Sequence, residues 1–304
     1  MRLGVLYGLG AYVLWGFLTI YWHELSGLSA FGLIGQRIVW SVLFLGIILA
    51  ITRHTAELRT VRHHPKLIAS AAVAALLLTV NWTTYVWCVT HNNVVETALG
   101  YFMAPLGTVA IGVIVLHERL RRTQVVALAL VAVAIVVLTA GYGRVPWFAL
   151  LLAVSWSCYG LLKKRVPLGP LSSLTLETLL LLPLALVLVG ATKAAGDGVF
   201  ANASTLQLVL VPLTGVVTAV PLLLFASAAH RVPLTVLGPL QYAVPVINFV
   251  LGVAVYDEAM PGWRLAGFAL VWVALAIFTI DGIRASRTGT PLPSPELEAV
   301  PLDG

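Results

Sequence analysis

The sequence is poor in charged residues and in cysteine. Only 10% of its 304 residues are Asp, Glu, Lys or Arg, whereas a soluble domain carries about 25%. The two cysteines, Cys88 and Cys158, both fall inside long apolar runs, which argues against a disulfide scaffold. The sequence also contains no Walker motif for nucleotide phosphates, which argues against direct coupling to ATP.

Long apolar runs dominate what is present, and 60% of the residues are hydrophobic. A helix needs about 20 mostly apolar residues to cross a bilayer, and its backbone must satisfy its own hydrogen bonds there. Runs such as 125–138 do not alternate in polarity, which excludes a barrel. We therefore expect an all-α integral membrane protein with ten spans, at about 4–22, 31–51, 67–90, 94–117, 124–141, 146–162, 173–192, 206–229, 233–256 and 263–281.

The basic residues predict the orientation in the membrane. Of the 18 Lys and Arg residues, 14 fall on the side of the N-terminus, three fall on the other side, and Arg37 lies inside the second span. Loops rich in Lys and Arg stay in the cytoplasm, so both termini are expected there. We interpret the first run as a retained helix, because no small-residue cleavage site follows it. Residues 285–304 are expected to form a disordered cytoplasmic tail.

An internal echo relates the two halves of the chain. A shift of 140 residues carries the stretch 94–118 into the stretch 233–258 and aligns Pro105 with Pro245, Gly112 with Gly252, and Glu118 with Glu258. Five spans per half would insert the halves in opposite directions, as in many secondary transporters, and matched broken helices would mark a midplane site. We expect repeats at 1–143 and 144–284. Chance similarity between two apolar helices remains the alternative.

Short motifs between residues 4 and 284 resemble a known family. They include Tyr12-Val13-Leu14-Trp15-Gly16, Gln36-Arg37-Ile38-Val39-Trp40-Ser41, Asn81-Trp82, Glu96-Thr97-Ala98-Leu99-Gly100-Tyr101-Phe102, Glu118-Arg119 and Val220-Pro221-Leu222-Leu223. The chain resembles the EamA branch of the drug/metabolite transporter superfamily, and more closely its RarD-type members. One departure is Gln36, where the family pattern has histidine, and this weakens a proton-coupling role at that position.

The resemblance implies two bundles of five helices around a central cavity. The first, third, fourth, sixth, eighth and ninth spans would line that cavity. It also implies transport of small metabolites or drugs across the bacterial inner membrane. It does not identify the substrate.

Polar and aromatic residues at midspan suit a cavity for amphipathic solutes. The candidate cavity residues are Trp15, Asn81, Trp82, Tyr85, Tyr101, Phe102, Trp156, Tyr159, Gln241, Tyr242 and Asn248. Ordinary helix packing is the alternative for each of them. Trp22, Trp147 and Trp263 lie near span ends, where aromatic residues are usually interface anchors.

Five further residues are candidates for gating or coupling. Arg37 and Glu177 are intramembrane charges 140 residues apart, for a substrate or gating contact or for structural pairing, including with each other. Glu96 could carry a proton if burial raises its pKa, or could favour a helix N-terminus. Pro105 and Pro245 would kink their helices, either as hinges or as static bends.

These features favour a secondary transporter of small organic solutes that works by alternating access. The alternatives are a non-transporting membrane receptor or scaffold and, with less support, an intramembrane enzyme, for which no midspan nucleophile and base can be paired. We expect no enzymatic activity, cofactor or metal. The expected partners are a small-molecule substrate and the lipid bilayer, with no nucleic acid, since the net charge of +6 is spread between spans. Proton coupling and a homodimer are compatible with the sequence.

Overall fold

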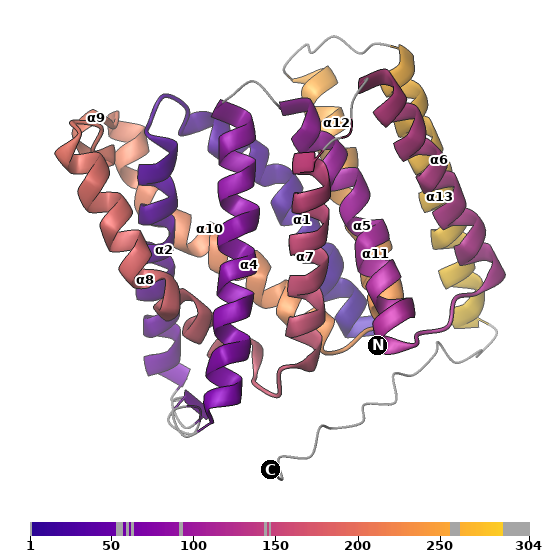
Figure 1. Ribbon diagram of the computed structural model, residues 1–304, viewed down its shortest axis with the longest axis horizontal. Helices are drawn as coiled ribbons and strands as arrows, with labels where there is room; N and C mark the ends of the chain where they lie inside the picture. The colour runs from indigo at the N-terminus through magenta and orange to yellow at the C-terminus, as the bar shows by residue number, and fades with distance from the viewer. Residues whose placement is uncertain are drawn as a thin grey trace.

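The computed structural model describes residues 2–52, 57–58, 61, 64–90, 94–142, 145, 147–255 and 262–287. These residues are mostly helical and include no strand. The elements are α1 (Arg2–Glu24), α2 (Ala30–Thr52), α4 (Pro65–Thr90), α5 (Val94–Leu116), α6 (Arg122–Tyr142), α7 (Trp147–Arg165), α8 (Pro170–Ala194), α9 (Val199–Asn202), α10 (Thr205–Ala229), α11 (Leu234–Leu240), α12 (Ala243–Ala254) and α13 (Gly262–Arg287) (Figure 1).

The helical fold class is confirmed in the described residues. Each predicted span falls on a helix, or in the ninth case on the pair α11 and α12. Within the described residues, six helices are long and apolar enough to cross a membrane, namely α1, α2, α4, α6, α8 and α10, and shorter apolar stretches lie in α5, in α11 with α12, and in α13. Large apolar side chains such as Ile51, Ile114 and Val187 are more than half exposed. Such an apolar exterior suits contact with lipid.

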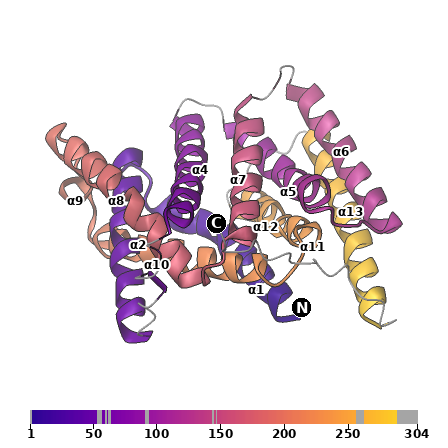
Figure 2. The ribbon, with the colours of Figure 1, turned by 60° about the horizontal axis from the view of Figure 1, so that its bottom comes forward.

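The packing of the helices repeats with the 140-residue shift. Three helices pack against their own equivalents: α2 against α8, α5 against α11, and α6 against α13. The contact between α1 and α10 is matched by that between α7 and α4, and the contact of α5 with α7 is matched by that of α12 with α1. Figures 1 and 2 show α2 with α8 at one edge and α6 with α13 at the other. The two halves therefore pack as related units about a shared centre.

The ninth predicted span is broken, but its echo in the first half is not. α5 runs continuously through Pro105, whereas α11 ends at Leu240 and α12 begins at Ala243. Pro239 and Pro245 both lack the N–H that would bond four residues back, and the position equivalent to Pro239 in the first half is Leu99. The backbone N–H of Gln241 instead bonds three residues back, to the carbonyl of Gly238 at 3.0 Å. The predicted pair of matched breaks is thus a single break in the described chain.

α11 approaches α5 closely beside this break. A Cβ atom at Gly238 would lie only 2.9 Å from the carbonyl oxygen of Pro105. Glycine removes that clash and lets the two backbones come together. This contact between the two halves of the chain lies only three residues before Gln241, where the helix is broken.

Candidate functional site

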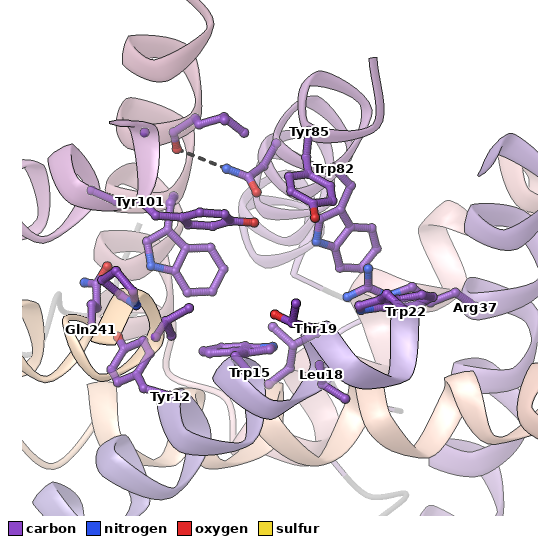
Figure 3. Close-up of a pocket in the computed structure, with 18 of the residues that line it drawn as sticks. Tyr12, Trp15, Leu18, Thr19, Trp22, Arg37, Trp82, Tyr85, Tyr101 and Gln241 are labelled. Carbon is purple, nitrogen blue, oxygen red and sulfur yellow. Dashed lines mark hydrogen bonds between the residues drawn. The ribbon is translucent and has the colours of Figure 1, made fainter. Parts of the chain in front are cut away.

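A cavity of about 710 Å³ lies between the two halves (Figure 3). Each of the six spans named by the resemblance contributes to its wall, through α1, α4, α5, α7, α10 and the α11–α12 break, and α2 adds Arg37. The lining residues are Tyr12, Trp15, Leu18, Thr19, Trp22, His23, Ser26, Arg37, Asn81, Trp82, Tyr85, Gly100, Tyr101, Ala104, Leu152, Trp156, Leu222, Gln241, Val244 and Pro245.

The cavity lies where the duplicated halves meet. Several of its residues form pairs separated by 140 positions: Tyr12 with Leu152, Trp82 with Leu222, Tyr101 with Gln241, and Ala104 with Val244. Equivalent positions of both repeats therefore face the same space. A relative motion of the halves would change the shape of this cavity more than that of a pocket inside one half.

One end of the cavity reaches the surface and the other is closed. Ser26, which follows α1, lines the cavity and is exposed. At the opposite end Tyr12, Phe225 and Leu237 belong to one apolar cluster and are each at most 2% exposed. This cluster separates the cavity from the N-terminal end of α1.

Beyond the apolar cluster, a buried carboxylate joins the two halves. Glu118, just after α5, accepts hydrogen bonds from the backbone N–H groups of Leu234 at 3.0 Å and Thr235 at 2.8 Å. It therefore caps the N-terminus of α11, where the helix dipole favours a negative charge. Lys164 lies 3.7 Å from the same carboxylate and donates to the carbonyl of Val232. The charge of each buried group is thereby compensated.

Two amide side chains on the cavity wall are anchored by bonds to other helices. Asn81 of α4 donates to the carbonyl of Leu152 at 3.0 Å and to the hydroxyl of Ser155 at 2.9 Å. Gln241, at the break after α11, donates to the hydroxyl of Thr108 on α5 at 2.8 Å. Each amide is held in place before a ligand arrives, which favours a fixed binding geometry.

Arg37 lies at the end of the cavity opposite Gln241 (Figure 3). Its Nε donates to the hydroxyl of Thr218 at 2.7 Å. Its guanidinium carbon lies 4.0 Å from the centre of the Trp82 ring and 5.3 Å from that of Trp22. Arg37 thus does not pair with Glu177, which was one of the possibilities that the sequence left open.

Glu177 lies outside the cavity, in a buried ion pair. Structural pairing was the alternative to a functional role that the sequence left open. Its carboxylate accepts hydrogen bonds from Lys163 Nζ at 2.5 Å, from the Ser173 hydroxyl at 3.0 Å and from the Tyr159 hydroxyl at 3.2 Å. Because α7 extends to Arg165, Lys163 belongs to a helix and is only 1% exposed, whereas the predicted span ended at residue 162. Tyr159 was predicted on the cavity wall, but this bond and its stacking on Phe225 hold it in the packed interior.

Other predicted residues also lie away from the cavity wall. Phe102 and Tyr242 pack in an apolar cluster with α6 and α13, and the Tyr242 hydroxyl donates to the carbonyl of Phe102 at 3.3 Å. Pro105 faces α11 rather than the cavity. Gln36 accepts a hydrogen bond from Trp40 of its own helix. The side chains of Glu96 and Asn248 lie outside what the structure describes.

The structure places Trp15, Asn81, Trp82, Tyr85, Tyr101, Trp156 and Gln241 on the cavity wall, together with Arg37 and Pro245. Sequence reasoning missed most of the α1 contribution. Tyr12, Trp15, Thr19 and Trp22 recur every three or four residues and so share one face of α1. That spacing could have identified the face, but Trp22 was interpreted as an interface anchor because it lies near the span end.

Comparisons with known proteins agree with this architecture. The sequence profile of the EamA-like transporter family matches residues 2–140 and again 144–280. The chain is 46% identical to Protein RarD of Streptomyces exfoliatus, covering 94% of this chain and 91% of that one. It is 36% identical to Protein RarD of Escherichia coli, with 94% and 97% covered, and 37% identical to the uncharacterized transporter YojE of Bacillus subtilis, with 93% and 96% covered.

A solved structure shares the fold. The one titled "Crystal structure of protein" superposes with a TM-score of 0.67, covering 92% of this chain and 99% of that chain at 21% identity. At that identity the likeness is one of fold alone.

Proposed function

The chain belongs to the EamA-like transporter family, and from that premise we propose that it is a secondary transporter moving small organic solutes by alternating access. The family and the relatives named above make it a multi-pass membrane transporter of bacterial type. The proposal adds the substrate class and the mechanism. The observation that carries it is a cavity between two related halves, open at one end and sealed at the other.

The proposed arrangement has ten membrane crossings in two inverted repeats, 1–143 and 144–284. The crossings are α1, α2, α4, α5, α6, α7, α8, α10, α11 with α12, and α13. The two family matches and the repeated packing support the duplication, and the Lys and Arg distribution supports cytoplasmic termini in the bacterial inner membrane. In this orientation the cavity opens to the outside and Glu118 seals the cytoplasmic end.

Alternating access requires the sealed end to open while the open end closes. The seal consists of contacts between the halves, including Glu118 with the N-terminus of α11 and Gly238 with Pro105. Such contacts can be exchanged as one repeat rocks against the other. A scaffold needs no cavity, and a receptor needs a ligand site but no pair of related halves around it, so both alternatives have less support. Proton coupling through Glu96 stays a prediction.

Shortening two cavity side chains should slow transport without unfolding the protein. We expect Tyr101→Ala and Gln241→Ala to reduce initial uptake by roughly two- to tenfold, because each removes an orienting contact from the wall. The measurement is uptake by proteoliposomes of a solute identified in a screen of amino acids, nucleosides and aromatic acids. Val136→Ala, on the exterior of α6, is the control. Normal uptake by both cavity variants would remove these side chains from the site.

A further inference from the structure

The cavity wall carries a positive charge without a matching carboxylate. Among the described residues, the buried cations Lys163 and Lys164 pair with carboxylates, at distances of 2.5 and 3.7 Å. Arg37 has no carboxylate partner within the described part of the chain, where its hydrogen bond goes to the neutral hydroxyl of Thr218. An intramembrane charge is costly and usually marks a partner or a function.

The guanidinium of Arg37 is positioned for a ligand. Its guanidinium carbon lies over the ring of Trp82, a contact that uses the π surface of the ring. The N–H donors of Arg37 lie along the edge of its guanidinium group. Of these, the Nε–H already donates to the hydroxyl of Thr218. The outer nitrogens can therefore donate two parallel bonds to one carboxylate, which is the geometry that arginine binds best.

Among the residues that the structure describes, none that lines the cavity would repel such an anion. The described lining contains Arg37 and His23 but neither Asp nor Glu. In a space with low-dielectric walls, charge of one sign concentrates solutes of the opposite sign. A cation would find no carboxylate on the described wall.

The rest of the cavity suits an apolar or aromatic body. Four tryptophans line it, Trp15, Trp22, Trp82 and Trp156, and Trp15 and Trp156 meet edge to face with centroids 5.2 Å apart. Figure 3 shows Arg37 with Trp22 and Trp82 at one end, Tyr12 and Gln241 at the other, and Trp15 between them. The volume of about 710 Å³ lies within the usual range for small-molecule sites.

We infer that the solute bound in this cavity is an organic anion: its carboxylate pairs with Arg37 and its apolar or aromatic body lies among the tryptophans. This inference rests on the proposed function in taking the cavity as the transport site. Arg37 is the specificity-determining residue, and Trp82 and Thr218 hold its guanidinium in position.

Three probes with one carbon skeleton test the charge of the ligand. Phenylacetate is an anion, phenylacetamide is neutral and 2-phenylethylamine is a cation. Quenching of tryptophan fluorescence in the purified protein reports binding, since four tryptophans line the cavity. Uptake of the same compounds by proteoliposomes reports transport separately.

The wild-type protein is expected to bind phenylacetate about 10- to 100-fold more tightly than either of the other probes, the range for a hydrogen bond to a charged group. Arg37→Gln should abolish this preference, and Arg37→Lys should retain part of it. Arg231→Gln is the matched control, because Arg231 also lies over a ring, that of Tyr7, but outside the cavity. It should bind phenylacetate like the wild type.

Equal binding of the three probes, no binding of any, or an undiminished preference in folded Arg37→Gln protein would overturn the inference. Binding of phenylacetate with no transport of any solute in a wider screen would instead overturn the proposed function and leave the anion site standing. Transport of neutral or cationic solutes without a preference for the anion would overturn the anion site and leave the proposed transporter function standing.

Discussion

Replacing Glu177 with alanine is expected to destabilise the folded protein by about 3–5 kcal/mol, the cost of leaving one partner of a buried ion pair uncompensated. The side chains of Lys163 and Glu177 are each 1% exposed, and Lys163 Nζ lies 2.5 Å from Glu177 Oε1. The substitution would leave the buried ammonium of Lys163 without a carboxylate and would remove the acceptor of the Tyr159 hydroxyl. A large fall in the thermal unfolding temperature in detergent would be the direct readout.

The double substitution Lys163→Met with Glu177→Leu provides the internal control. Apolar side chains of similar size avoid the buried charge, and such replacements are often neutral or stabilising. The double variant should therefore be more stable than Glu177→Ala. If Glu177→Ala unfolds at the wild-type temperature, the ion pair between Lys163 and Glu177 does not stabilise the fold.

Replacing Glu118 with alanine is expected to open the sealed end of the molecule. The change removes the acceptor of two buried N–H groups and leaves Lys164 without its carboxylate. Hydrogen bonds to charged groups contribute about 1.5–3 kcal/mol each, so losing even one of them shifts an open–closed equilibrium by roughly 10- to 100-fold. Because these bonds connect the halves of the chain, the shift should favour the state open to the cytoplasm.

A cysteine placed at Thr108 can report this opening. Thr108 is 1% exposed, and Gln241, at the far end of the cavity from Arg37, donates to it. An impermeant thiol reagent added to the cytoplasmic side should modify Thr108→Cys faster in the Glu118→Ala background. Glu118→Gln, which keeps the size and one acceptor, should give an intermediate rate. Equal rates in all three backgrounds would show that Glu118 does not seal this end.

The helices and the duplication could be predicted from the sequence because the bilayer imposes strong local rules. Length, hydropathy and backbone satisfaction define helical spans residue by residue, and the 140-residue echo of Pro105 and Gly112 needs no knowledge of the fold. Much of the cavity followed as well, since Tyr101 and Gln241 are polar groups within apolar spans. These features are visible one helix at a time.

The remaining features depend on which helix faces which, and the sequence does not show that. Glu177 looked like a candidate for function until α7 placed Lys163 beside it. Phe102 and Tyr242 are midspan aromatic residues of the kind expected in a cavity, but they pack against α6 and α13 instead. Pro239 breaks the ninth span and has no counterpart in the first half. The two helices are therefore less alike than the repeated sequence positions predicted.

Blocking the cavity with a thiol reagent tests whether it is the route of the solute. Leu18 lines the cavity, whereas Phe17, its neighbour in α1, is 51% exposed on the exterior. Each is replaced by cysteine in a background in which Cys88 and Cys158 are alanine, and uptake is measured before and after labelling. Modification at position 18 should stop uptake, and the solute should slow that modification, whereas modification at position 17 should leave uptake intact. Undiminished uptake with position 18 fully modified would contradict the central cavity as the transport pathway.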